Sequence, residues 1–103
     1  MRTEVLTVST SPVGLTEGIY KVANFGRAAR AYPRALITVE GAGIRMRLDG
    51  QDAEAAVGGG HLISVGSTIT LESASEIEKF SAVRSGGSDA TLFISYLPRK
   101  AGA

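Results

Sequence analysis

Apolar and polar residues alternate along several short segments of the chain, as they do in β-strands. A clear case is IRMRL at 44–48, in which three apolar side chains alternate with two arginines. Successive side chains of a strand point to opposite faces, so this pattern predicts a strand with one buried face. The segment ATLFISYLP at 90–98 shows the strongest strand pattern in the chain.

Other segments show weaker forms of the same pattern. Further strands are predicted at 1–10, 18–24, 34–41 and 77–84, with two short strands or one kinked strand in 61–73 around Gly66. Short Gly-containing turns predict two hairpins, 34–41 with 44–48 and 77–84 with 90–98. Two places favour helix. The alanines of 25–33 predict a turn or two ended by Pro33, and Ser75 with Glu78 offers a capped helix as the alternative to a strand in 77–84.

The number and spacing of these segments indicate the fold class. Seven or eight short strands, bounded by Gly, Pro, Ser or Asp, predict an all-β protein: a small antiparallel β-sandwich or a jelly-roll-like barrel. A chain of 103 residues is expected to form one domain over 1–103. Within it, 1–17 form an N-terminal arm or an edge strand, and 98–103 form a flexible tail.

Composition excludes several kinds of protein. The chain has no cysteine, so disulfides and thiolate sites are excluded, and their absence favours a cytosolic origin or stabilisation by assembly. No apolar run is long enough to span a membrane. The net charge of +1 provides no general attraction to nucleic acid, so neither membrane nor direct nucleic-acid binding is expected.

Charges of opposite sign are segregated along the chain. Residues 18–48 carry six basic side chains and one acid, whereas 49–78 carry six acids and no Lys or Arg. Either the two blocks form a two-signed surface that binds a partner, or they neutralise each other within the monomer. Because Arg and Tyr are enriched at interfaces, the candidate partner contacts are Arg27, Arg30, Tyr32, Arg34, Arg45, Arg47, Asp49, Asp52 and Glu54.

The loop at 49–60 contains residues that suggest chemistry but fall short of each motif. Its acids lack the order of an EF-hand, and the glycines before His61 lack the lysine of a phosphate loop. His61 is the only histidine, too few for a typical His metal site. We therefore expect no enzyme, metal or cofactor, with a cupin-like enzyme centred on His61 as the catalytic alternative. The loop is predicted to be a long, flexible, acidic connection, and His61 a partly buried, hydrogen-bonded strand residue.

The half of the chain from Ile44 to Tyr96 resembles small structural proteins of tailed bacteriophages. The resemblance lies in IRMRLDG, in GGGHLISVGSTITLES, and in a closing pattern formed by Phe80, Ala82, Val83 and Arg84 followed by Ala90, Leu92, Ile94 and Tyr96.

This resemblance implies a virion component without enzymatic activity, made in the cytoplasm of the host bacterium. The role it favours is a capsid decoration or cement protein that bridges capsid subunits. Its partners would be the major capsid protein or other virion subunits, and copies of itself in a homo-oligomer such as a trimer. A head–tail connector, a tail-associated protein and a glycan- or receptor-binding β module of the virion are the alternatives.

Overall fold

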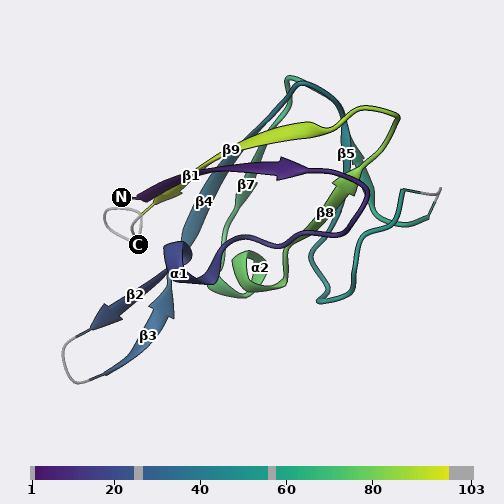
Figure 1. Cartoon of the computed structure of the whole chain (residues 1–103). Coiled ribbons are helices and arrows are strands. Elements are labelled where there is room, and N and C mark those ends of the chain that lie inside the picture. The colour runs from purple at the N-terminus through teal and green to yellow at the C-terminus, as the bar shows by residue number, and fades with distance from the viewer. Residues whose placement is uncertain (1, 25–26, 56–57, 98–103) are drawn as a thin grey trace.

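The computed structural model describes residues 2–24, 27–55 and 58–97, and these form nine strands and two short helices (Figure 1). In chain order the elements are β1 (Arg2–Val8), α1 (Glu17–Tyr20), β2 (Lys21–Asn24), β3 (Arg27–Ala31), β4 (Arg34–Glu40), β5 (Ile44–Arg47), β6 (His61–Ile63), β7 (Thr68–Leu71), α2 (Ala74–Lys79), β8 (Ser81–Arg84) and β9 (Ala90–Leu97). The predicted tail at 98–103 lies outside the described residues.

The strands form two main antiparallel sheets. One has four strands in the order β1-β9-β4-β7 and the other has three in the order β6-β5-β8, while β2 and β3 form a separate two-stranded ribbon. The predicted all-β class is confirmed, and the arrangement is that of a small antiparallel sandwich. There are nine strands instead of seven or eight because an additional strand, β3, forms in the segment for which a helical turn was predicted.

The chain bends from the first sheet into the second between two central strands, β4 and β5. β4 and β5 are separated only by residues 41–43, yet they lie in different sheets. β9 and β8 follow them along one side, and β7 and β6 follow them along the other. Gly41 and Gly66 have φ angles of 81° and 87° at this corner, a conformation that favours glycine.

Both predicted hairpins are therefore wrong. β4 pairs with β7 and β9 but not with β5, and β8 pairs with β5 but not with β9. The short Gly-containing turns fold the strands over into the second sheet and do not reverse them against their neighbours. Of the two alternatives predicted around Gly66, two short strands are observed, because β6 and β7 lie on either side of it in different sheets.

The core fills the space between the two sheets. Alternate residues of β4 and β9 point into it, as the sequence pattern predicts. The largest fully buried side chains are Val8, Ile37, Val39, Ile44, Leu71, Ile77, Leu92, Ile94 and Tyr96. They come from all four strands of the first sheet, from β5 of the second sheet and from α2, so the two sheets and the helix share one core.

The preferred strand prediction for 77–84 is wrong for residues 77–80. Residues Ala74–Lys79 form α2, and β8 begins only at Ser81. The helix is capped two residues earlier than the alternative prediction placed the cap. The Oγ of Ser73 accepts a hydrogen bond from the Glu76 amide at 3.2 Å, and the Glu76 carboxylate accepts one from the Glu72 amide at 3.0 Å.

The segments before Pro33 also differ from the sequence prediction. Residues 17–20 form a helical turn where a strand was predicted, and 27–31 form β3 where a helical turn was predicted. An isolated helix of this length is not stable in water, so cross-strand pairing with β2 overrides the weak preference of the alanines. Figure 1 shows the β2–β3 ribbon extending away from the two sheets.

The first 17 residues contain an edge strand, not a free arm. β1 pairs with β9 along its whole length. Its inward-pointing Glu4 is buried and accepts hydrogen bonds from the Tyr96 hydroxyl at 2.8 Å and from the Thr16 amide at 3.1 Å. These bonds satisfy a buried carboxylate that would otherwise oppose folding.

Tyr96 also packs against two other tyrosines. Its ring centroid is 5.8 Å from that of Tyr32, in a stacked arrangement, and 6.3 Å from that of Tyr20. Burial raises the pKa of Tyr96, and the hydrogen bond to Glu4 and its negative charge raise it further. One end of the core is therefore organised around a single phenol.

Replacing Tyr96 with phenylalanine removes the hydroxyl and keeps the ring. We expect Tyr96→Phe to lower the free energy of unfolding by about 1.5–3 kcal/mol, because a buried carboxylate loses a donor. Urea unfolding followed by circular dichroism measures this. Tyr32→Phe is the control and should change the value by less than about 0.5 kcal/mol; a Tyr96→Phe variant as stable as that control would contradict the role of the bond.

Alkaline pH should destabilise the fold through the same residue. The pKa of Tyr96 lies above its ordinary value of 10.0 in the folded chain. Its stabilising contribution is therefore complete below pH 10 and declines as the pH rises above that value. We expect a step in phenolate absorbance that coincides with unfolding and is smaller in Tyr96→Phe. A step well before unfolding that is lost in Tyr96→Phe would contradict the assignment.

Candidate functional site

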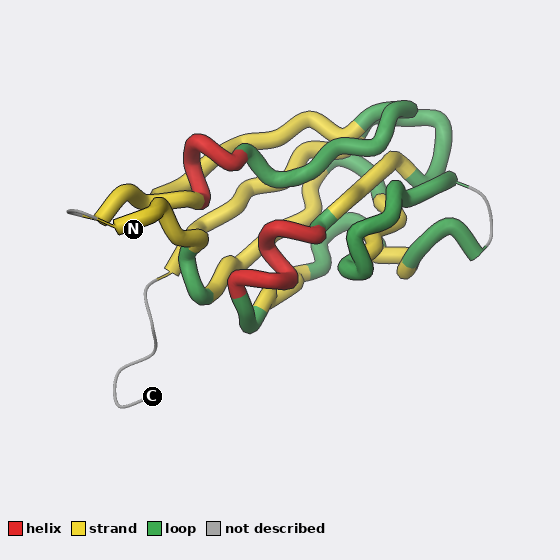
Figure 2. The backbone as a smooth tube through the Cα atoms, turned by 90° about the horizontal axis from the view of Figure 1, so that it is seen from below, coloured by secondary structure: helices red, strands yellow, loops and turns green. Residues whose placement is uncertain are grey.

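The nine predicted contact residues lie at two opposite ends of the molecule. Both views place the β2–β3 ribbon at one end and the loop after β5 at the other (Figures 1 and 2). Arg27, Arg30, Tyr32 and Arg34 belong to the ribbon end, and Arg45, Arg47, Asp49, Asp52 and Glu54 belong to the loop end. The structure does not bring the two groups together into one site.

At the ribbon end, Arg27 and Arg30 lie on β3. Tyr32 follows the ribbon and is part of the core packing, because its ring stacks on Tyr96 and its amide donates to the Tyr20 carbonyl at 2.8 Å. Arg34 begins β4, and its buried Nε has no hydrogen-bond partner among the described residues. Tyr32 is thus better explained by packing than by partner binding.

At the loop end, the two arginines of β5 hold their own loop. Arg45 donates from Nε to the Ala55 carbonyl at 3.1 Å and from a terminal nitrogen to the Gly60 carbonyl at 3.2 Å. Arg47 forms a two-pronged pair with Asp49, in which Nε lies 3.1 Å from Oδ1. Neutralisation within the monomer is therefore observed for this pair, while Asp52 and Glu54 are exposed.

The pair changes the acidity of both groups. The hydrogen bond from Arg47 lowers the pKa of Asp49, and the backbone amide of Gln51 lowers it further by donating to Oδ1 at 3.1 Å. The same pairing raises the pKa of Arg47. Asp49 is thus held as a carboxylate whose oxygens are used within the loop.

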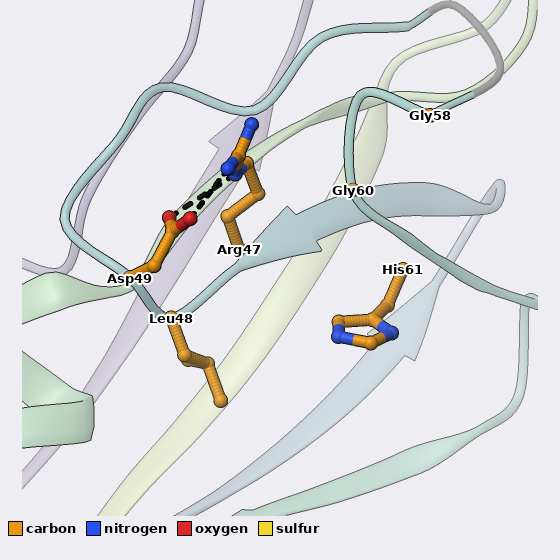
Figure 3. Close-up of a pocket in the computed structure, with 6 residues that line it drawn as sticks. All are labelled: Arg47, Leu48, Asp49, Gly58, Gly60 and His61. Atoms are coloured by element: carbon orange, nitrogen blue, oxygen red, sulfur yellow. Dashed lines mark hydrogen bonds and ion pairs between the residues drawn. The ribbon is translucent and has the colours of Figure 1, made fainter.

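An open hollow of about 500 Å³ lies beside this pair (Figure 3). It is lined by Arg47, Leu48, Asp49, Gly58, Gly60 and His61. Figure 3 shows the imidazole of His61 apart from the Arg47–Asp49 pair. His61 begins β6 with an exposed side chain, so the expectation that it would be partly buried is wrong.

The loop is anchored to the body, which corrects its description as a flexible connection. Ala53 is buried, and its amide donates to the Ser81 hydroxyl of β8 at 3.0 Å. The Glu54 amide donates to the Gly59 carbonyl at 2.8 Å. A Cβ on Gly59 would lie 2.2 Å from the Glu54 carbonyl oxygen, and one on Gly60 would lie 2.8 Å from that of Met46. These two glycines are required by close packing within the chain.

The acids of the loop do not form a metal centre in the part of the chain that the structure describes. No group of three or more His, Cys, Asp or Glu side chains that could hold an ion occurs in those ranges. No helix in the same ranges is long and apolar enough to cross a membrane.

No protein-family model, curated protein or solved structure matches the chain. The phage resemblance therefore remains a prediction from the sequence.

The exposed apolar side chains form surfaces that the candidate contacts did not include. Leu36, Val5 and Phe93 lie on the outer face of the four-stranded sheet, with exposed fractions of 38%, 66% and 44%. Leu62 and Val65 are 60% and 57% exposed on and beside β6. The second group lies in the stretch 62–71, whose lack of charged residues is its signal in the sequence. The candidate contacts were predicted from charged and aromatic residues and therefore did not include it.

Adding a methyl group at Gly59 should disturb the loop. We expect Gly59→Ala to lower the free energy of unfolding by about 1–3 kcal/mol, because the Cβ would collide with backbone. Gly87→Ala is the matched control, since a Cβ at that position would have nothing within 4 Å. Chemical denaturation gives both values, and hydrogen exchange at the Glu54 amide reports the loop itself. Equal stability of the two variants would show that the loop is loose.

Proposed function

We propose that this chain is a non-enzymatic structural protein that binds neighbouring subunits in a larger assembly. The resemblance to tailed-phage structural proteins suggests the setting, a virion, and the role of capsid decoration protein. In that role the chain would be made in the host cytoplasm and would bridge subunits of the capsid. A head–tail connector or tail-associated position is the alternative within the same class.

The observation that carries the proposal is the projecting β2–β3 ribbon. Its two strands pair only with each other among the described residues and extend away from the sandwich (Figure 1). An isolated two-stranded ribbon is only marginally stable in water, so contact with a partner would stabilise it. Residues 21–31 contain three basic side chains and no acid, which suits an acidic patch on that partner.

The outer face of the four-stranded sheet supports the same kind of function. Around the exposed Val5, Leu36 and Phe93, its other positions are mainly Thr and Ser, and the registers place Thr3, Thr7, Thr38, Thr68, Thr70, Thr91 and Ser95 on this face. A face with apolar and hydroxyl groups and few charges resembles the central part of protein–protein interfaces, from which charged residues are depleted.

The tyrosines give less support to the glycan-binding alternative. Tyr20 and Tyr96 are buried, and Tyr32 stacks on Tyr96. They are used in the core and do not form an exposed stacking surface for a sugar ring.

The test uses particles of the phage whose genome encodes this chain. We expect purified heads to contain the protein in a fixed ratio to the major capsid protein, measured by quantitative mass spectrometry after separation from tails. In particles prepared without it, added wild-type protein should rebind, and Arg27→Glu with Arg30→Glu should rebind at least about tenfold more weakly, because two positive charges of the ribbon are reversed.

Lys79→Glu is the matched control, an exposed charge reversal on α2 outside the ribbon. It should rebind like wild type. Confinement of the protein to tails or necks would favour the connector alternative, and its absence from purified particles would contradict a virion role altogether. Equal rebinding of the ribbon variant and the control would show that the ribbon is not the contact.

A further inference from the structure

One edge of the molecule is open in both sheets. β6 is the last strand of the three-stranded sheet and β7 is the last strand of the four-stranded sheet. They are consecutive in the chain and meet at Gly66, so 61–71 form one continuous bent edge. Among the described residues, β6 pairs only with β5 and β7 pairs only with β4.

The hydrogen-bond pattern shows which backbone groups this edge presents. The Val39 amide donates to the Ser67 carbonyl at 2.9 Å, at the start of the β4–β7 ladder. Alternate residues of an antiparallel strand bond to the same neighbour, so Ile69 and Leu71 direct their backbone groups towards β4. Thr68 and Thr70 therefore direct their N–H and C=O groups outward, away from the sheet.

The side chains on this edge lack the features that normally prevent pairing. From 62 to 71 there is no charged residue and no proline. Edge strands of soluble proteins commonly carry lysine, proline or an inward-pointing charge. Here Leu62 and Val65 are exposed apolar side chains, and Ile69 is half-buried at the open edge.

The opposite edge, β1, is different. It contains Arg2 and the buried, inward-pointing Glu4. Arg2 donates to the carbonyls of Gly18 and Ile19 at 3.2 and 3.3 Å, so the segment near α1 lies beside this strand. Of the two edges of the four-stranded sheet, only the β7 edge is therefore both unprotected and uncharged.

We propose that the β7 part of this edge pairs with β7 of a second copy of this chain, antiparallel and about a two-fold axis. In such a pair each residue faces a residue of the same uncharged segment, so no register opposes like charges. Thr68 of one copy would lie opposite Thr70 of the other, as in the Thr–Thr pairs that stabilise sheets. The two four-stranded sheets would then join into one continuous sheet.

The second copy is favoured over other partners by this absence of charge. A charged strand from another protein would find no opposite charge on the edge, whereas a copy of the edge requires none. Leu36 pairs across to Thr70 within the sheet, one strand in from the seam. The inference does not depend on the virion role, because it concerns the purified chain in solution.

Sedimentation of the full chain over a range of concentrations tests the proposal. We expect a dimer at concentrations up to about 1 mM, the range that detects even weak binding. Thr70→Pro should raise the dissociation constant by about tenfold or more, because the two-fold pair loses two backbone donors at once. The amide of Thr70 points away from β4, so the intramolecular ladder should keep its bonds.

Thr70→Lys provides a second variant in case the proline variant does not fold, and circular dichroism shows which variants are folded. It places a charge on the edge and should also weaken the dimer. Its matched control is Thr7→Lys, the same change at an exposed position on β1. Thr7→Lys should dimerise like wild type.

Three results would overturn the proposal. One is a wild-type chain that remains monomeric up to about 1 mM; in that case the edge, if it pairs at all, takes a strand from a different protein. Another is a folded Thr70→Lys chain that dimerises as tightly as wild type. The third is equal weakening by Thr7→Lys, which would show that β7 pairs with β1 of the next copy, as in a ring.

Discussion

The bend in the central strand is the constraint on which the rest of the structure depends. Because β4 and β5 belong to one run of chain, the register in the four-stranded sheet determines which residues meet in the three-stranded sheet. Gly43 lies at this corner, and space there is tight, since a Cβ would be 3.0 Å from Ser85 Oγ and 3.1 Å from the Ile63 carbonyl oxygen. The bend also determines where the loop after β5 and the open β6–β7 edge lie. It places the 48–60 loop at one end of the molecule and makes β6 and β7 a single continuous edge.

Polar contacts then hold the less regular segments against this frame. Glu4 links β1 to Tyr96 of β9 and to Thr16 of the returning segment, so one buried carboxylate joins three parts of the chain. Ser81 performs a similar role for the loop by accepting from the Ala53 amide. In each case a buried polar group has partners from distant residues, which is why these segments have a defined position without regular secondary structure of their own.

The surfaces of the molecule suggest assembly more than chemistry. The basic ribbon, the Thr-rich outer face and the uncharged edge are three separate areas, and each fits a protein partner by a different physical means. The charged residues near the hollow at His61 are occupied with the conformation of their own loop, as the Arg47–Asp49 pair shows. The proposed contacts with other subunits and with a second copy use different areas, so both could form at the same time.

The sequence by itself determined the all-β class, the alternating faces of β4, β5 and β9, and the interruption of the strand pattern at Gly66, because these depend on local periodicity and backbone preference. It could not determine which strands pair. A Gly-containing turn of three residues can reverse a strand or bend it into another sheet, and only the packing of Ile37, Ile44 and Leu92 in one shared core selects the bend. The candidate contacts were predicted from charge, but charge does not show whether an arginine reaches a partner or its own loop. Tertiary structure decided that Arg45 and Arg47 hold the loop and that Tyr32 packs on Tyr96, because both outcomes depend on residues far apart in the sequence.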